Sequence, residues 1–488
     1  MQNKIVMTAC LRQYKKFLSK RFFAYSLLAY LFIGAFVASI LLTQSALAQI
    51  PQSKNEIQAS FAPVVAKVAP AVVNVYAKRL VKTRRSPLFD DPFFGEFFGR
   101  NFDGRERVQN SLGSGVIISP DGIVVTNNHL IRGSAELTVV LADRREFKAD
   151  ILLADERTDL AVLQIKADDD MRFAALEYHN SDAVAVGDLV LAIGNPFGIG
   201  QTVTSGIVSA LARTQVGVSD FQSFIQTDAA INPGNSGGAL VTMDGRLLGI
   251  NTVIYTRSGG SLGIGFAIPS NMVQQVVRAT LSDGKIIRPW LGAQLQNVSQ
   301  SLADTVGLPR PIGALILAMH PQSPLQAAGL MAGDVIIAIA GRDINTPEEL
   351  RYRLAVQEIG GRVGLVYLRD GTRYESDIAL IVAPETPPRN QTWLSGNHPL
   401  NGLEIANINP AVEEELGAHD LKTGVIVVGI KPSQTANRAR LRVGDIVQTI
   451  NGKTVKKVAD VQQALTESPA RWQIEYRRGK RLIRSTIR

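Results

Sequence analysis

Short hydrophobic runs separated by turn residues fill the chain from about residue 60 to residue 268. The runs are four to six residues long and rich in Val, Ile and Leu, and they include residues 71–76, 115–118, 123–126, 137–141, 160–165 and 189–193. Many short strands at this spacing are typical of a β-barrel or β-sandwich. This part of the chain is therefore predicted to be all-β.

One long insertion interrupts these runs. Residues 78–109 separate the first run from the second and hold two aromatic pairs, Phe93-Phe94 and Phe97-Phe98. A loop of this length inside a compact domain is usually either functional or disordered. We therefore expect this insertion to be either a functional or a disordered segment.

The second half of the chain contains an internal repeat. Residues 333–336 and 444–447 each read Gly-Asp followed by two branched apolar residues, and a further glycine follows eight residues after the first, at an offset of 111. Upstream, residues 290–292 and 400–402 pair at an offset of 110. Two copies of one module of about 90 residues are therefore predicted after the barrel.

Each module also has one clear helical candidate. The first begins at Thr346, which caps the helix, and Pro347 takes its first position. The second candidate covers residues 458–465. Strands with one or two helices make the modules α+β, and the Pro-, Asn-, Ser- and Gly-containing stretch 384–398 reads as the linker between them.

The first 48 residues have the pattern of an export signal. A basic segment precedes the apolar run 22–42, and Ala46-Leu47-Ala48 forms a small-residue cleavage site before Gln49. The pattern favours a cleaved signal peptide and a periplasmic protein. The apolar run is also long enough to span a bilayer, so an N-terminal membrane anchor stays open.

The leader also explains most of the positive charge. The formal net charge is +9, but six of the 52 Lys and Arg residues precede residue 22, which leaves 46 against 43 Asp and Glu in the rest of the chain. A nucleic-acid partner thereby loses its main support. The single cysteine, Cys10, lies in the leader as well, so disulfides and thiol catalysis are excluded for the exported part.

The candidate chemistry lies at Ser236, which glycines surround in the segment 234–238. Acyl transfer from a serine needs a base, an acid that orients the base, and N–H groups aimed at the oxyanion. His129 ends a β-type run and suits the base, and Asp159 opens another run and suits the acid, with Asp155 as second choice. The amides of Gly234 and Ser236 are the expected oxyanion hole.

Rival sites fit the residues less well. The order His, Asp, Ser along the chain is that of chymotrypsin-type enzymes. In α/β-hydrolases the serine lies in a nucleophile elbow that leads into a helix, and the Asp and His follow the serine in sequence, which does not match the residues after Ser236. The glycine cluster 259–265 lacks the helix that a dinucleotide loop requires, and reads instead as a mobile loop entering a strand beside the substrate cleft. No His-Glu-x-x-His or paired-Cys motif occurs, so no metal or other cofactor is expected.

Together these residues resemble the HtrA (Do or Deg) serine proteases, and specifically the exported members with two PDZ domains. The resemblance covers nearly all of the chain after residue 55, and its most specific segments are 126–129, 158–161, 194–198, 204–210 and 226–238. It implies a chymotrypsin-like double barrel followed by two α+β PDZ domains. It also implies His129, Asp159 and Ser236 as triad, with neither ATP nor metal.

The resemblance further implies a substrate class and a mode of control. The substrates would be unfolded or misfolded envelope proteins cut after small aliphatic residues, and Ala230, Ile231 and Ile264 would form an apolar specificity pocket without a selecting acid, since Asp228 is expected to point elsewhere. Peptide C-termini would bind two PDZ loops and activate the protease, with Arg213 as the sensing residue. The loop residues are Leu291 and Gly292 in the first copy and Gly402 and Leu403 in the second.

The domain expectations follow directly. They are a signal peptide at 1–48, a trypsin-like protease domain at 49–280, a first PDZ domain at 281–383, the linker at 384–398 and a second PDZ domain at 399–488. The long aromatic insertion resembles the inhibitory loop of self-caging relatives, which implies a homotrimer or multiples of a trimer. Two alternatives stay open: a membrane-anchored regulatory protease that cuts one signalling substrate, and a holdase chaperone.

Overall fold

The computed structural model describes residues 60–81, 107–196, 200–213, 223–232, 234–254, 263–282, 284, 286–306, 308–417, 423–431, 440–467, 469 and 471–487. The predicted leader, most of the aromatic insertion and the loop after Arg213 lie outside the described residues. Within the described ranges, no helix is long and apolar enough to cross a membrane.

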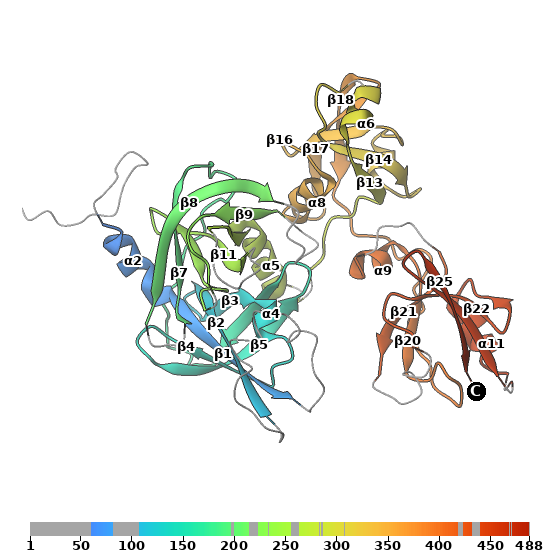
Figure 1. Cartoon of the computed structure of the whole chain (residues 1–488), viewed down its shortest axis with the longest axis horizontal. Coiled ribbons are helices and arrows are strands. Elements are labelled where there is room, and N and C mark those ends of the chain that lie inside the picture. The colour runs from blue at the N-terminus through green and yellow to red at the C-terminus, as the bar shows by residue number, and fades with distance from the viewer. Residues whose placement is uncertain are drawn as a thin grey trace, which may run out of the picture. The chain divides into compact units, whose positions relative to one another are not determined.

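The first six strands close into a barrel in the order β1-β2-β3-β6-β5-β4 (Figure 1). They are β1 (Val72–Val81), β2 (Arg107–Ser119), β3 (Ile123–Asn127), β4 (Glu136–Val140), β5 (Glu146–Asp155) and β6 (Leu160–Ile165). Two short helices, α2 (Ala62–Val68) and η1 (Ala69–Ala71), precede the barrel, and a third, α4 (Asn128–Ile131), follows β3. Every residue of β3 is buried, which explains why it opens with three successive apolar residues, 123–125.

A second closed barrel follows, in the order β10-β11-β12-β9-β8-β7. Its strands are β7 (Leu189–Gly194), β8 (Thr202–Arg213), β9 (Phe224–Thr227), β10 (Ala239–Thr242), β11 (Leu247–Ile254) and β12 (Gly265–Pro269), and the helix α5 (Ser270–Ser282) comes after them. Apolar side chains of all six strands meet in its interior, among them Val190, Val208, Ile225, Leu240, Leu248 and Ala267. The predicted all-β fold is therefore confirmed as a double barrel.

The first predicted module is an antiparallel sheet in the order β13-β14-β15-β17-β18, with β16 paired to β15. The strands are β13 (Ala293–Asn297), β14 (Ala314–Met319), β15 (Val335–Ile339), β16 (Arg342–Asp343), β17 (Arg362–Arg369) and β18 (Thr372–Ala379), with helices α6 (Gln300–Thr305), α7 (Pro324–Ala327) and α8 (Pro347–Ala355). As predicted, α8 begins after Thr346, whose side chain accepts a hydrogen bond from the Glu349 amide.

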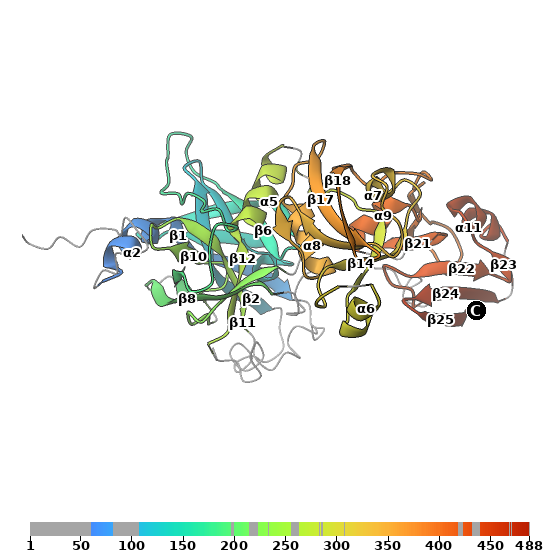
Figure 2. The ribbon, with the colours of Figure 1, turned by 90° about the horizontal axis from the view of Figure 1, so that it is seen from above.

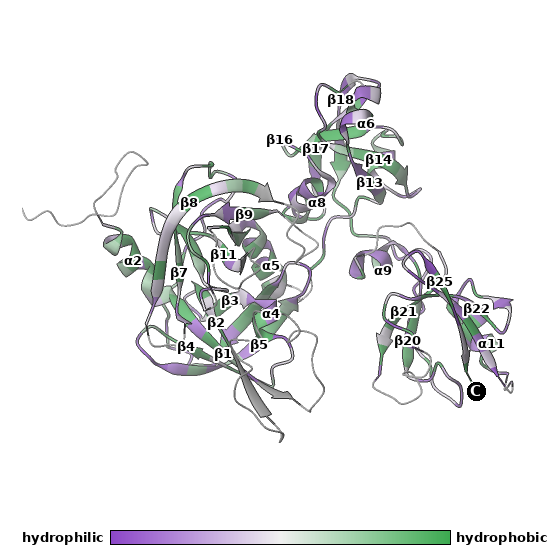
Figure 3. Ribbon diagram, viewed as in Figure 1, coloured by the Kyte–Doolittle hydropathy of each residue, from purple (hydrophilic) through white to green (hydrophobic). Residues whose placement is uncertain are grey.

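The second module has an equivalent sheet with one further strand at its edge, in the order β19-β20-β21-β22-β24-β25 with β23 paired to β22, and Figure 2 shows β22, β24 and β25 side by side. Its elements are β19 (Thr392–Trp393), β20 (Leu403–Asn407), α9 (Pro410–Glu415), β21 (Val425–Ile430), β22 (Ile446–Ile450), β23 (Lys453–Thr454), α11 (Val458–Ala464), β24 (Trp472–Arg478) and β25 (Arg481–Ile487). Figure 3 colours β20 and β21 largely as hydrophobic and α9 as hydrophilic.

The repeated Gly-Asp pair has a structural role in both modules. Asp334 lies 2.8 Å from the Arg369 guanidinium, and Asp445 lies 2.7 Å from that of Arg478. Each carboxylate is almost fully buried and also accepts a main-chain amide three residues upstream, from Met331 in the first module and from Arg442 in the second. The aspartate therefore ties the turn before its strand to an arginine in a later strand.

Candidate active site

His129 and Asp159 meet because two neighbouring strands end at the same place. β3 pairs antiparallel with β6, and its last residue, Asn127, lies opposite Leu160, the first residue of β6. The residues just after β3 and just before β6 therefore face one another. His129 is carried by the single turn of α4 that follows β3, and its side chain is 29% exposed, so it reaches the protein surface.

The Asp159 carboxylate is held from several sides. Its Oδ2 lies 2.8 Å from His129 Nδ1, and its Oδ1 accepts the His129 amide at 3.0 Å. Asp159 has a φ of +58°, a left-handed conformation that Asp tolerates better than most residues, and its side chain is only 6% exposed. The structure thus brings Asp159 to the histidine, whereas Asp155 accepts a hydrogen bond from Thr158 Oγ1 at 2.6 Å.

Ser236 lies in a tight turn before β10. Gly234 and Gly237 on either side have φ values of +108° and +80°, which favour glycine. A Cβ at Gly237 would lie 2.1 Å from the Ser114 carbonyl oxygen, so the turn has no room for a side chain there. Within the part of the chain that the structure describes, the Gly234 and Ser236 amides donate to no acceptor. They are the two amides that the sequence predicts for an oxyanion hole.

Thr252 in β11 joins the serine to the aspartate. The Ser236 hydroxyl donates to the Thr252 carbonyl oxygen at 3.0 Å, and Thr252 Oγ1 donates to Asp159 Oδ2 at 2.9 Å. Thr252 is buried, so its bond to Asp159 is shielded from water, whereas the bond from Ser236 is only partly buried. No sequence signal points to this residue, because Thr252 lies in the middle of a strand with no motif around it.

Ser114 in β2 supports the serine turn from the first barrel. Its hydroxyl donates to the Gly234 carbonyl oxygen at 2.5 Å and accepts the Asn195 amide at 2.8 Å. Its own amide donates to the Ser236 carbonyl oxygen at 2.9 Å. Sequence reasoning missed this residue too, although a serine between Gly113 and Gly115 inside a strand signals close backbone approach.

The predicted pocket residues lie in the second barrel. Ile231 is buried, and a Cβ at Gly265 would lie 2.8 Å from its Cδ1, so the missing side chain at Gly265 makes room for it. Ala230 and Ile264 are partly buried. Asp228 Oδ1 accepts the Ile207 amide at 2.7 Å, so this carboxylate is engaged by β8.

The other predicted residues lie at strand ends. Arg213 is the last residue of β8, and its backbone pairs with Phe224 of β9; its side chain lies outside the described part of the structure. Leu291 and Gly292 directly precede β13, while Gly402 precedes β20 and Leu403 opens it. Among the described residues, no group of His, Cys, Asp and Glu could hold a metal ion.

Comparisons with known proteins agree on the kinds of domain that this chain contains. A family model for the trypsin-like peptidase domain matches residues 113–250, and one for the PDZ domain matches residues 289–380. A probable periplasmic serine endoprotease DegP-like from Chlamydia pneumoniae is 35% identical over 443 residues, which cover 87% of this chain and 89% of the relative. A probable periplasmic serine protease do/HhoA-like from Haemophilus influenzae is 38% identical, with 88% and 92% covered.

Solved structures of proteases also match this chain. An HtrA-type protease AlgW with a tripeptide is 38% identical, with a TM-score of 0.51 over 67% of this chain and 98% of that chain. The same protease with a decapeptide is 42% identical, with a TM-score of 0.50 over 67% of this chain and all of that chain.

Proposed function

Because the chain belongs to the HtrA family of DegP-like serine endoproteases, we propose that His129, Asp159 and Ser236 form its catalytic triad. The observation that carries this assignment is the Asp159 carboxylate, which binds the Nδ1 atom and the amide of one histidine. A buried acid in this position fixes the ring and its tautomer. Ser236 is connected to the same network through Thr252, which accepts the serine hydroxyl and donates its own hydroxyl to Asp159.

The proposed reaction is acyl transfer through Ser236. With Nδ1–H donated to Asp159, the Nε2 atom of His129 is the basic nitrogen and takes the hydroxyl proton as Oγ attacks the peptide carbonyl. Since the hydroxyl donates to the Thr252 carbonyl oxygen in this structure, it must turn toward His129 when substrate arrives. The Gly234 and Ser236 amides stabilise the oxyanion, and His129 then protonates the leaving amine.

The assignment is tested with the full chain on casein, an unfolded substrate. Ser236→Ala and His129→Ala should each lower kcat by about 10⁴-fold or more. His179→Ala is the matched control for the base, because His179 lies outside the network and uses its amide to bind the Leu247 carbonyl oxygen. Equal loss in the two histidine variants, or casein cleavage by Ser236→Ala, contradicts the triad.

The proposed substrates are unfolded or misfolded proteins cut after small aliphatic residues. The pocket residues Ala230, Ile231 and Ile264 are apolar, and the nearby Asp228 carboxylate is already bound by the Ile207 amide. A basic side chain would thus lack a partner in this pocket. Peptide libraries that vary the residue before the scissile bond should favour Val, Ala and Ile over Lys and Arg.

The proposed control acts through peptide C-termini that bind the loop at Leu291 and Gly292. Within the described ranges neither amide has an acceptor, and Gly292 has a φ of +62°, a conformation that lets successive amides converge on an anion. The related AlgW structures contain a tripeptide and a decapeptide. Arg213, at the end of β8, would then relay occupancy to the catalytic loops.

The remaining proposals concern the location of the protein, its assembly and its domain bounds. The relatives are named periplasmic, which supports a periplasmic protease; cleavage after Ala48, as opposed to retention as an anchor, is the finer proposal. The proposed assembly is a homotrimer or a multiple of it, and light scattering of the full chain tests this. The proposed domain bounds are 49–280, 281–383 and 399–488, joined by the linker 384–398.

A further inference from the structure

The two PDZ modules differ at one edge of their sheets. β13 and β20 are equivalent strands, because each follows a loop whose glycine has positive φ and each pairs with the next strand of its module. In the first module β13 is the edge strand of the described sheet, whereas in the second module β19 pairs with the outer side of β20. β19 belongs to the stretch that the sequence predicts as linker.

β19 runs antiparallel to β20, with Trp393 opposite Glu404. The pairing extends beyond the two residues of β19, since the Leu394 amide donates to the Leu403 carbonyl oxygen at 2.8 Å. At the other end the Asn407 amide donates to the Arg389 carbonyl oxygen at 2.7 Å. Residues 389–394 therefore lie along β20 as an added strand, which is the way extended peptides bind PDZ domains.

The loop amides of the second module are already used. The Gly402 amide donates to the Leu394 carbonyl oxygen at 2.9 Å, and the Leu403 amide donates to that of Leu400 at 3.1 Å. In the first module the equivalent Gly292 amide has no acceptor among the described residues. The Leu394 carbonyl thus takes the position that a peptide carboxylate would need.

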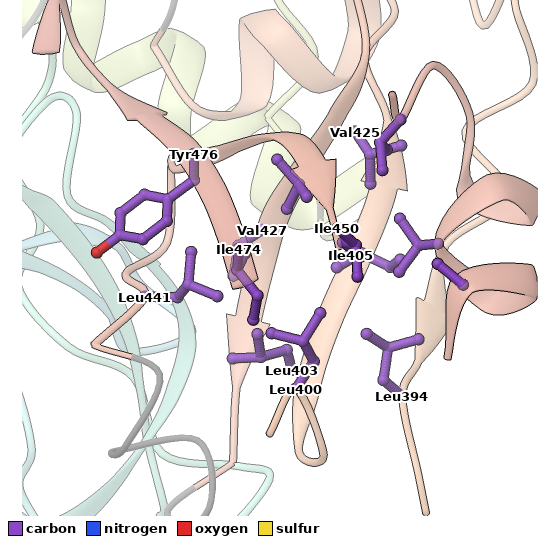
Figure 4. Close-up of a cluster of buried hydrophobic side chains, with 14 of the residues drawn as sticks. Leu394, Leu400, Leu403, Ile405, Val425, Val427, Leu441, Ile450, Ile474 and Tyr476 are labelled. Atoms are coloured by element: carbon purple, nitrogen blue, oxygen red, sulfur yellow. The ribbon is translucent and has the colours of Figure 1, made fainter. Parts of the chain in front are cut away.

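The side chain of Leu394 completes the resemblance to a bound peptide. It is 5% exposed and belongs to the main apolar cluster of the module, together with Leu400 and Leu403 (Figure 4). The same cluster includes the α11 residues Val458 and Val461. An apolar last side chain buried between a strand and a helix is what PDZ grooves select.

Trp393 gives the strand a second anchor. The Lys431 ammonium lies 4.4 Å from the centre of the Trp393 ring, a cation–π geometry. Gly429 leaves space for this ring, since a Cβ there would lie 3.2 Å from Trp393 and 2.6 Å from the Glu404 carboxylate. Two side chains of segment 389–394 are therefore accommodated by residues of the second module.

We propose that segment 389–394 is a built-in ligand of the second PDZ module, so that this module does not take peptide C-termini until Leu394 is displaced. The first module, with its open edge, is then the resting receptor for apolar C-terminal peptides. This second clause rests on the proposed function of the Leu291–Gly292 loop, whereas occupancy of the second groove does not.

Disulfide trapping tests the occupancy directly. Trp393→Cys with Glu404→Cys is introduced into the full chain that carries Cys10→Ser and Ser236→Ala, so no other thiol is present. Directly opposite residues of antiparallel strands have the spacing that a disulfide requires. We expect near-complete cross-linking in air, unchanged by excess peptide. The matched control, Thr392→Cys with Glu404→Cys, places the thiols on opposite faces and should remain reduced. Equal cross-linking of both pairs, or none of the first, overturns the proposal.

Peptide stoichiometry tests the consequence. A decapeptide with a free C-terminal leucine is titrated calorimetrically into the Ser236→Ala chain, and we expect one peptide per chain. The cross-linked form should bind it with a Kd within about twofold of the reduced form. Leu394→Ser should raise the number to two.

Loss of binding in the cross-linked form, or two sites in the chain with Leu394 intact, overturns the proposal. Should Leu394→Ser unfold the second module, which circular dichroism reveals, the cross-linked form decides alone. If no form binds the peptide, the proposed activation by peptide C-termini is wrong. The cross-linking experiment then still tests whether segment 389–394 occupies the second module.

Discussion

Thr252 Oγ1 donates a hydrogen bond to Asp159 Oδ2 at 2.9 Å, and this bond crosses from the second barrel to the first. The carboxylate that binds His129 is therefore positioned by both barrels. Because the Thr252 carbonyl oxygen also accepts the Ser236 hydroxyl, one strand, β11, binds two members of the proposed triad. The mutual position of the barrels thus affects the site through Thr252, as it does through Ser114 at the serine turn.

The first prediction concerns this hydroxyl. Thr252→Val keeps the shape and removes one donor to a charged acceptor, a loss of about 1.5–3 kcal/mol, so kcat on a peptide substrate should fall by about tenfold or more. KM should change little, since Thr252 is proposed to act through Asp159. Thr252→Ser retains the hydroxyl and should recover most of kcat. A larger loss in Thr252→Ser than in Thr252→Val would assign Thr252 a packing role instead, because only the serine variant loses the methyl group.

A second prediction concerns the support of the serine turn. Ser114→Ala removes the donor to the Gly234 carbonyl oxygen and leaves that buried group unsatisfied, which should cost about 1–3 kcal/mol of stability. Looser turn geometry should also lower kcat more than it raises KM, as steady-state kinetics will show. Ser119→Ala, on the exposed end of the same strand, is the control and should leave both quantities unchanged. A stability loss without any change in kcat would contradict the positioning role.

The third prediction compares the thermal stability of alanine variants at two glycines with positive φ. Gly187 has a φ of +97°, and a Cβ added there would meet no atom within 4 Å, so Gly187→Ala should cost only the backbone strain, about 1–2 kcal/mol. Gly237→Ala adds a contact of 2.1 Å with the Ser114 carbonyl oxygen and should cost about 3 kcal/mol more. Equal Tm values for the two variants would show that the turn can move aside.

The strands, and the residues of the proposed triad, can be picked out from the sequence because their signals are local. β3 opens with three successive apolar residues and β6 with four, and the residues at their ends follow from antiparallel pairing. β5 has no clear signal, because most of its residues are exposed and its apolar positions do not alternate. β19 has the composition of a linker, since Thr392 and Trp393 stand among Pro, Asn, Ser and Gly residues.

Thr252 and Ser114 cannot be found in the same way. Their partners lie 93 and 120 residues away in sequence, and their roles arise only where the barrels meet. The Gly-Asp repeat can be predicted only in part. Its period identifies two modules, but the arginine that pairs with each aspartate lies more than 30 residues downstream and is identified only by the fold.

The last prediction tests that repeated ion pair. Arg478 donates through Nε and Nη2 to Asp445 at 2.8 and 2.7 Å, and Nη2 also donates to the Arg440 carbonyl oxygen. Arg478→Met leaves a buried carboxylate whose remaining described donor is the Arg442 amide. Breaking a fully buried pair costs about 3–5 kcal/mol, and because Arg478 is 31% exposed, we expect the lower part of that range or slightly less.

Amide exchange in β22 and β24 measures this loss within the full chain. Adding Asp445→Asn to Arg478→Met removes the stranded charge and should restore part of the stability, which separates the electrostatic cost from lost packing. Arg484→Met is the matched control, since Arg484 pairs with Glu475 on the neighbouring strand but is 77% exposed, and its removal should cost about 0–1 kcal/mol. Arg369→Met should weaken the first module in the same way as Arg478→Met weakens the second. Similar losses for the exposed and buried arginines would mean that the Gly-Asp repeat acts through its turn alone.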